Sequence, residues 1–259
     1  RGFGREWAKA ALGRGDKVAA TARNTDSLMD LVNEYGDSIL PIRLDVTDRD
    51  ADFAAVKRAH EHFGRLDVIV NNAGYGLFGA IEEISEAEAR AQLETNLFGA
   101  LWVTQAALPY LRGQRGGHII QVSSVGGVAA FPGVGLYHAS KWALEGFSDA
   151  LSQEVTQFGI KVTLIEPGGF NTDWAGSSSV HATENPLYNS VRGSRPTPPN
   201  KRGYPEATAE AILKVVDAEN PPLRLLLGNF AFDYVKALYP KRLATWAEWE
   251  TVTRAADGI

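Results

Sequence analysis

The chain has 259 residues, a formal net charge of −5 and 44% hydrophobic residues. This length suits one large α/β domain, residues 1–259, rather than a disordered chain. The absence of Cys excludes disulfide frameworks, Cys-type zinc sites, iron–sulfur clusters and thiol nucleophiles. The mixed charge disfavours nucleic acid and membrane surfaces as partners. With no apolar run long enough for a membrane span and no signal segment, we expect a cytoplasmic protein.

The first residues, Arg1-Gly2-Phe3-Gly4, run directly into a predicted helix that ends near Gly13 or Gly15. Glycines at a helix start let a phosphate approach the free N–H groups, whose partial positive charge would stabilise it. No strand precedes this turn in the chain, so an ordinary glycine-containing helix start remains an alternative.

Further along, short β-branched runs alternate with segments of helical composition. The predicted strands are Val18–Ala22, Ile39–Leu44, Leu66–Val70, His118–Val122, Lys161–Ile165 and Leu223–Leu227. The predicted helices are Asp26–Tyr35, Asp50–Phe63, Glu86–Leu111, Leu136–Phe158, Glu206–Ala218 and Phe230–Trp249. Most gaps between the runs are long enough for a crossover helix, which favours a parallel sheet covered on both faces.

Residues 168–205 break this alternation, because they are rich in Ser, Asn, Gly and Pro and show no period. The segment follows the carboxyl end of a predicted strand, where ligands of open α/β sheets bind. We therefore expect a substrate-covering loop, with a flexible insertion as the alternative.

The most informative chemical pattern is Tyr137-x-x-x-Lys141, at the start of a predicted helix. The two side chains share a face, and an ammonium close to a phenol favours the phenolate and lowers the phenol's pKa. Such a pair can donate and accept a proton. Ser124 follows the strand His118–Val122 and is placed to hydrogen-bond a substrate oxygen. A Tyr-x-x-x-Lys taken alone is more often a surface helix pair.

Together with Asn71-Asn72-Ala73-Gly74 after a strand, Ser124 thirteen residues before Tyr137, and Pro167-Gly168 followed by Thr172, the chain resembles the short-chain dehydrogenase/reductase family. The resemblance implies a Rossmann-type, doubly wound parallel sheet in a single domain. The runs Ser124-Val125-Gly126-Gly127 and Trp142-Ala143-Leu144-Glu145-Gly146 look like the hydroxysteroid dehydrogenase-like branch.

The resemblance also implies the roles of individual residues. Tyr137 is the general acid/base, Ser124 polarises the substrate carbonyl, and Lys141 lowers the Tyr pKa and binds the nicotinamide ribose. Asn96 supports a proton-carrying water. The implied cofactor-binding residues are Arg1, Gly2, Phe3 and Gly4 at the first turn, Asp45 and Val46 at the adenine ring, Asn72, Ala73 and Gly74 at the adenine ribose, Tyr137 and Lys141, and Pro167, Gly168 and Thr172 at the nicotinamide amide.

The choice of cofactor depends on the end of the second family strand. Thr21-Ala22-Arg23-Asn24 has no acid for a ribose 2′-OH and offers Arg23 instead. Arg1 provides a second basic position. A guanidinium suits a 2′-phosphate, which a carboxylate would repel, so NADP(H) is predicted over NAD(H).

Aromatic residues in the segments expected around the pocket favour an apolar or aromatic ketone or alcohol as substrate: Tyr75, Phe78, Phe131, Trp174 and Tyr188. The family forms dimers and tetramers through helices corresponding to Glu86–Leu111 and Leu136–Phe158, so we expect a homodimer or homotetramer. The five His are isolated or point in different directions on a helix, so no metal site is expected.

The family's first motif, Thr-Gly-x-x-x-Gly-x-Gly after a central strand, is represented only by its last four positions, Arg1 to Gly4. We expect an N-terminal piece of about ten residues or more, a strand plus its turn, to be absent from this sequence. Residues 1–259 alone are then expected to fold poorly and to bind cofactor weakly.

The predicted function is an NADP(H)-dependent carbonyl reductase or alcohol dehydrogenase. The alternative is a catalytically silent NADP(H)-sensing or scaffold protein on the same fold, since fold alone does not fix function. The intact Ser124, Tyr137 and Lys141 set disfavours that alternative. A nucleotide-sugar epimerase on a related fold is disfavoured by the short C-terminal part.

Overall fold

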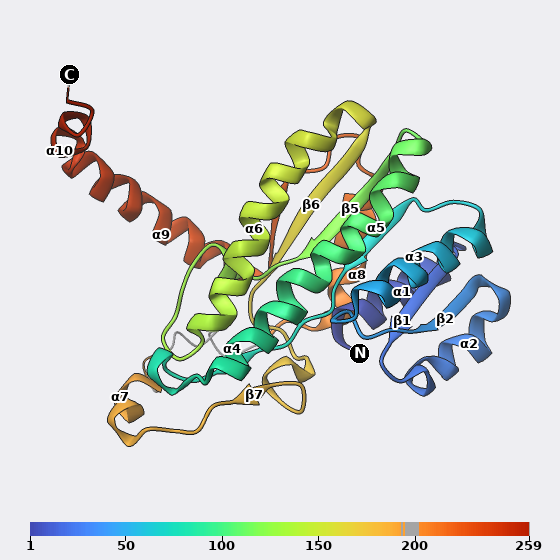
Figure 1. Ribbon diagram of the computed structural model, residues 1–259, viewed down its shortest axis with the longest axis horizontal. Coiled ribbons are helices and arrows are strands. Elements are labelled where there is room, and N and C mark those ends of the chain that lie inside the picture. The colour runs from blue at the N-terminus through green and yellow to red at the C-terminus, as the bar shows by residue number, and fades with distance from the viewer. Residues whose placement is uncertain (193, 195–201, 259) are drawn as a thin grey trace.

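The computed structural model describes residues 1–192, 194 and 202–258 (Figure 1). Its strands form three parallel sheets rather than one. The main sheet has the order β3 (Val68–Asn71), β5 (Gly117–Val122), β6 (Ile160–Pro167) and β8 (Arg224–Leu227). A second sheet pairs β1 (Val18–Ala22) with β2 (Ile39–Arg43), and a third pairs β4 (Leu77–Phe78) with β7 (Val180–His181).

All six expected strands are present within two residues of their predicted bounds, but the expected single sheet is split. In the described part of the chain, β1 pairs only with β2 and β3 pairs only with β5. One edge of β3 is therefore unpaired, and Val70 on that strand is 39% exposed. The two-residue strands β4 and β7 were not predicted, because so short a run carries no periodic pattern.

Helices cover both faces of the main sheet, as its apolar strands require. In Figure 1, α5 and α6 lie on one face, and α1 and α8 on the other. Alternate residues of a strand point to opposite faces, so Ile119 packs with Leu111 of α5 while Ile120 packs with Trp7 of α1. The long helices are α1 (Gly2–Gly13), α3 (Arg49–Phe63), α5 (Gly99–Gly113), α6 (Gly135–Val155), α8 (Ala209–Asp217) and α9 (Asn229–Glu248). The shorter ones are α2 (Met29–Tyr35), α4 (Glu86–Leu93), α7 (Asn189–Arg192) and α10 (Glu250–Ala255).

The predicted helix Glu86–Leu111 is interrupted. Its start is as expected, because the Ser85 hydroxyl accepts from the Glu88 N–H while the Glu88 carboxylate accepts from the Ser85 N–H at 2.9 Å. Between α4 and α5, however, Glu94–Phe98 forms a π turn. Such turns often occur at functional sites, and this one contains Asn96.

The segment 168–205 is less irregular than expected. It includes β7, α7 and 3₁₀ turns at Asp173–Ala175 and Pro186–Tyr188. Its residues 193 and 195–201, with Pro196, Pro198 and Pro199, lie outside the described residues.

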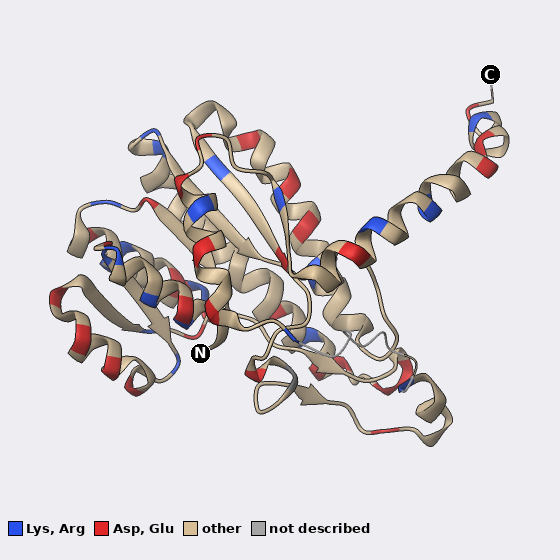
Figure 2. Cartoon of the chain, turned by 180° about the vertical axis from the view of Figure 1, so that it is seen from behind, with Lys and Arg blue, Asp and Glu red and all other residues tan. Residues whose placement is uncertain are grey.

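Helices α9 and α10 extend away from the rest of the molecule (Figures 1 and 2). Along α9 the exposed surface includes Leu243 and Trp246, which are 58% and 69% exposed. Figure 2 shows basic and acidic residues interspersed over the helices. No described helix is long and apolar enough to cross a membrane.

Candidate active site

Three of the predicted catalytic residues meet at the carboxyl end of β5. Ser124 follows this strand, and Tyr137 and Lys141 lie one turn apart near the start of α6, with exposures of only 6% and 4%. A hydrogen bond joins the Tyr137 side chain to Ser124. The Lys141 Nζ donates to the Val122 carbonyl at 2.8 Å and lies 6.0 Å from the centre of the Tyr137 ring. A half-buried hydroxyl therefore lies beside a buried phenol and a buried amine.

Asn96 reaches the same space from the π turn. Its Oδ1 accepts from the Tyr75 N–H at 3.1 Å, and its Nδ2 donates to the Tyr75 carbonyl and the Ser140 hydroxyl, both at 3.1 Å. A Cβ added at Gly74 would lie 3.1 Å from Asn96 Oδ1 and 3.5 Å from Lys141 Nζ. Gly74 thus borders both Asn96 and Lys141.

Burial dominates the electrostatics of this group. Burial raises the pKa of Tyr137 to about 12, although the hydrogen bond with Ser124 lowers it. It also lowers the pKa of Lys141 to about 8, while the nearby negative charge of Glu145 raises it. The net pKa of Tyr137 is therefore raised rather than lowered, because the effect of burial is larger than that of the hydrogen bond. The amine donates to a backbone carbonyl, and the phenol is enclosed by apolar groups that disfavour a charge.

The enclosure comes largely from Trp174, which belongs to the segment 168–205. Its ring centre lies 4.9 Å from that of Tyr137 and 5.3 Å from that of Phe78. Thr172 positions this turn, since its hydroxyl accepts from the Trp174 N–H at 3.4 Å. The described part of the segment therefore packs against Tyr137 through Trp174.

The other predicted pocket residues divide into two groups. Phe131 is near the site, because it packs against Tyr234 at 5.0 Å and against His138, the residue after Tyr137, at 5.3 Å. The Tyr188 hydroxyl instead donates to Glu82. Tyr188 does not belong to the hydrophobic cluster that contains Tyr137.

The glycines of the predicted cofactor segments border narrow spaces. Gly2 has a φ of +55°, and a Cβ there would lie 3.8 Å from the Thr172 Cβ. At Gly4 an added Cβ would lie only 2.5 Å from the Asn72 Nδ2. The helix start thus lies against Asn72 and Thr172, from two other predicted cofactor segments. Free N–H groups at this helix start, beside glycines that leave the backbone open, fit a pyrophosphate.

Other residues were predicted to contact the adenine ring and a 2′-phosphate, and their surroundings differ. Val46 packs against Gly99, where an added Cβ would lie 2.7 Å from Val46 Cγ2. The exposed Asp45 accepts from the Thr47 N–H at 3.1 Å. Arg1 and Arg23 are exposed, as contact with a phosphate requires.

The remaining predicted cofactor residues frame the same edge of the sheet. Phe3 stacks on Trp7 with ring centres 5.5 Å apart. Pro167 ends β6, and the Gly168 N–H donates to the Leu227 carbonyl at 2.9 Å. Ala73, after β3, is exposed.

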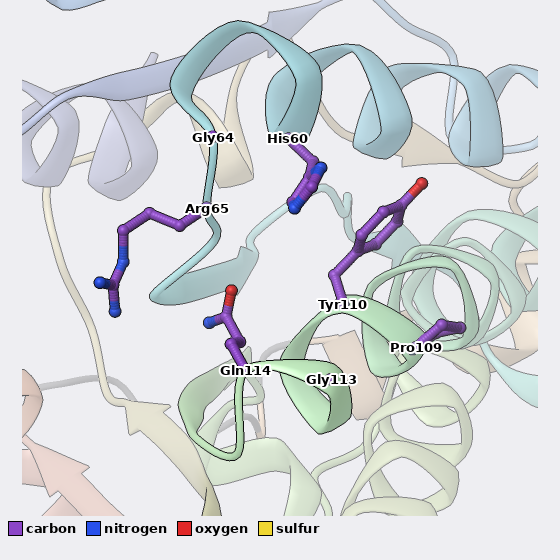
Figure 3. Close-up of a pocket in the computed structure, with 7 residues that line it drawn as sticks. All are labelled: His60, Gly64, Arg65, Pro109, Tyr110, Gly113 and Gln114. Atoms are coloured by element: carbon purple, nitrogen blue, oxygen red, sulfur yellow. The ribbon is translucent and has the colours of Figure 1, made fainter.

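A hollow of about 520 Å³ lies elsewhere, where α3 and α5 end (Figure 3). These helix ends precede β3 and β5, so the hollow is at the amino ends of the strands, opposite the catalytic edge. Its His60 and Tyr110 rings stack at 4.4 Å, and Gln114 donates to the Leu66 carbonyl. The hollow therefore contains none of the predicted site residues.

Sequence reasoning missed several residues around Lys141. Ser140 connects Asn96 to α6, and its hydroxyl also donates to the Tyr137 carbonyl at 2.6 Å. Glu145 lies one turn beyond Lys141, and Arg224 of β8 bonds to it at 2.9 Å. The spacing Tyr-x-x-x-Lys-x-x-x-Glu was a visible signal for Glu145, whereas nothing in the sequence connects Arg224 to this helix.

The chain is similar to known oxidoreductases over most of its length. The family model described as short chain dehydrogenase matches residues 1–182. Oxidoreductase BOA17 of Botryotinia fuckeliana is 44% identical over 262 residues, covering 99% of this chain and 96% of that protein. A short-chain dehydrogenase structure from Streptomyces avermitilis has a TM-score of 0.92 at 41% identity, covering 98% of this chain and 95% of that one.

A more distant structure shows a bound cofactor. The short chain dehydrogenase from Burkholderia cenocepacia in complex with NADP has a TM-score of 0.75 at 26% identity, covering 96% of this chain and 92% of that one. The match over most of the chain, together with the meeting of Ser124, Tyr137 and Lys141 at one sheet edge, shows that this chain belongs to the short-chain dehydrogenase family of oxidoreductases.

Proposed function

We propose that the protein is an NADP(H)-dependent carbonyl reductase or alcohol dehydrogenase that acts on apolar or aromatic ketones and secondary alcohols. The observation that carries this proposal is the meeting of Ser124, Tyr137, Lys141 and Asn96 at one sheet edge. The aromatic cover from Trp174 and Phe78 favours an apolar substrate.

Each residue has a defined task in the proposed reaction. Ser124 donates its hydroxyl hydrogen to the substrate oxygen and so polarises the carbonyl. Tyr137 donates its phenolic proton to that oxygen as the alcohol forms. Lys141 contributes a positive charge beside the phenol, which stabilises the phenolate left behind. Trp174 keeps water away from the reacting group.

The nicotinamide cofactor, when bound, supplies or accepts the hydride. The start of α1 at Gly2 and Gly4 would hold its pyrophosphate, and Val46 would contact the adenine. The exposed Arg1 and Arg23 would bind a 2′-phosphate, which supports NADP(H) over NAD(H). The Burkholderia cenocepacia relative with NADP supports the same choice.

The test is a panel of ketones and alcohols with NADPH and NADH, followed by nicotinamide absorbance. Tyr137→Phe removes the proton donor, so kcat should fall by at least about 100-fold. Tyr110→Phe, in the hollow of Figure 3, is the control and should leave kcat unchanged. Undiminished turnover by Tyr137→Phe would overturn the proposed mechanism. Tight NADPH binding without turnover on any substrate would instead favour an NADP(H)-sensing protein.

The choice of cofactor has its own test. Arg23→Glu should raise the Kd for NADPH about tenfold or more, because a carboxylate repels the 2′-phosphate. The Kd for NADH should change far less. Equal changes for both cofactors would place Arg23 outside the phosphate site.

We also propose that the chain forms a homodimer or homotetramer through α4, α5 and α6. Trp142 on α6 is 42% exposed, which supports an interface there. Light scattering measures the mass directly, and a monomer across the micromolar range would refute this proposal.

A further inference from the structure

One face of α6 carries ionisable residues at every fourth position. Tyr137, Lys141, Glu145 and Asp149 follow one another along this face, since residues four apart lie above one another on a helix. Lys141 and Glu145 are 4% and 5% exposed, whereas the Asp149 side chain is 43% exposed. The row therefore leads from the candidate active site to the surface.

A second buried carboxyl group meets this row from the sheet. Glu166 of β6 is 2% exposed. It lies two residues after Leu164, which packs against Leu144 of α6, so it points to the same face of the sheet. The side chains of Glu166 and Glu145 are in hydrogen-bond contact.

The Arg224 guanidinium lies within ion-pair distance of three carboxyl groups. Arg224 Nε lies 2.9 Å from Glu145 Oε2 and 3.9 Å from Glu166 Oε1, and Arg224 Nη2 lies 2.8 Å from Asp149 Oδ2. In the described part of the chain, no N–H or hydroxyl group is within hydrogen-bond distance of Glu145 Oε1 or Glu166 Oε1, although Arg224 lies near the latter. The contact between the two carboxyl groups is therefore a hydrogen bond only if one of them holds a proton.

The surroundings make that protonation favourable. Two carboxylates in contact and out of water cannot both ionise without a large cost. Burial, followed by the charge of Glu145, raises the pKa of Glu166 to about 8. The charged groups facing the pair are Lys141 and Asp149 from α6 and Arg224 from β8, while the turn after β5 presents Ser123 and Gly127.

We propose that Glu145 is a positioning residue for Lys141 and that Glu145 and Glu166 share one proton. The pair then carries a single negative charge, rather than two or none, beside the buried amine. Glu166 donates this proton to Glu145, and Arg224 binds the other oxygen of Glu145. The remaining negative charge holds Lys141 in its ammonium form although burial favours the neutral amine. The catalytic consequence rests on the proposed function, in which Lys141 stabilises the Tyr137 phenolate.

The first experiment compares pH profiles of kcat for ketone reduction in the wild type, Glu145→Gln and Asp149→Asn. Without the Glu145 charge, Lys141 loses its proton at lower pH. The variant should be about tenfold slower near pH 8.5 and within about twofold of the wild type near pH 6.5, which corresponds to a pKa change of about one unit. Asp149→Asn also removes an Arg224 contact, but from the exposed end, and should leave the profile unchanged.

A second experiment needs no turnover. Unfolding by urea is followed between about pH 5 and pH 9 for the wild type and Glu166→Gln. Since folding raises the pKa of Glu166, the free energy of unfolding of the wild type should fall, relative to Glu166→Gln, as the pH rises towards about 8. A double-mutant cycle combines Glu145→Gln with Lys141→Met. The loss in free energy of unfolding caused by Glu145→Gln should be smaller when Lys141 is already Met.

The outcomes separate this proposal from the proposed function. A Glu166→Gln difference that is constant with pH would exclude the shared proton. A Glu145→Gln loss of kcat that is equal at all pH values, or a cycle without coupling, would overturn the role of Glu145. If the wild type reduces no ketone, the proposed function fails, while the unfolding measurements still decide whether Glu145 acts on Lys141.

Discussion

Two glycines in helices should respond in opposite ways to the same substitution. Gly99 begins α5 and Gly146 lies within α6, both with helical backbone geometry. A Cβ at Gly99 would lie 2.7 Å from Val46 Cγ2 and 2.9 Å from the Val46 carbonyl oxygen. At Gly146 nothing lies within 4 Å. Alanine therefore has no room at Gly99 and ample room at Gly146.

The size of each effect follows from two opposing terms. Alanine is favoured over glycine by about 1 kcal/mol inside a helix, and by less in the first turn, where Gly99 lies. Overpacking against a backbone atom that cannot move aside costs about 1–3 kcal/mol. Gly99→Ala should thus lower the free energy of unfolding by about 1–2 kcal/mol, and Gly146→Ala should raise it by about 0.5–1 kcal/mol.

Urea unfolding and thermal melting measure both variants. For a domain of this size, each kcal/mol corresponds to about 2–4 °C in Tm. Because Gly99→Ala displaces Val46, it should also raise the Kd for NADPH, whereas Gly146→Ala should not. If Gly99→Ala were as stabilising as Gly146→Ala, the close contact with Val46 would not exist in solution. Unchanged NADPH binding in a destabilised Gly99→Ala would remove Val46 from the adenine site.

Three further substitutions test other parts of the molecule. Asp52 is fully buried, and burial followed by two nearby acidic residues raises its pKa from 3.8 to about 7, so the unfolding free energy falls as pH rises through this range. Asp52→Asn should remove this fall, so between pH 4 and pH 8 the variant's unfolding free energy should rise relative to that of the wild type by up to about 4 kcal/mol. Urea unfolding at several pH values measures this difference, and parallel curves for the two proteins would contradict it. Trp174→Ala should admit water to Tyr137 and lower its pKa. An ultraviolet titration of phenolate absorbance at alkaline pH measures this, and the signal should be absent when Tyr137→Phe is added. Gly4→Ala should displace the Asn72 amide and raise the Kd for NADPH about tenfold by fluorescence titration, and an unchanged Kd would separate this turn from the cofactor.

The sequence predicted the elements whose signal is local. The run from His118 to Val122 contains Ile119, Ile120 and Val122 and is buried on both faces, and such a short apolar run is a local signal for a buried strand. The spacing of Tyr137 and Lys141 placed both on one helix face, and the structure confirms that they share a buried space. The capping box at Ser85 was equally visible, since both partners lie within four residues.

The features that sequence reasoning missed depend on contacts between distant segments. The π turn at Asn96 is a change of backbone register that no composition signals. The pKa of Tyr137 depends on Trp174, which packs on it from a segment without periodic pattern. The contact of Glu166 with Glu145 depends on the position of α6 over β6, which only the folded chain shows.

The perturbed pKa values also bear on the direction of the proposed reaction. At neutral pH Tyr137 is a protonated phenol, because burial raises its pKa to about 12, and Lys141, with a pKa of about 8, is mostly an ammonium. Reduction of a ketone needs this proton, whereas oxidation of an alcohol needs the phenolate. Reduction should therefore dominate near pH 7, and oxidation should accelerate as pH rises. Initial rates in both directions, measured from about pH 6 to pH 10 with one ketone–alcohol pair, test this. An oxidation rate that is independent of pH would show that Tyr137 does not take up the proton.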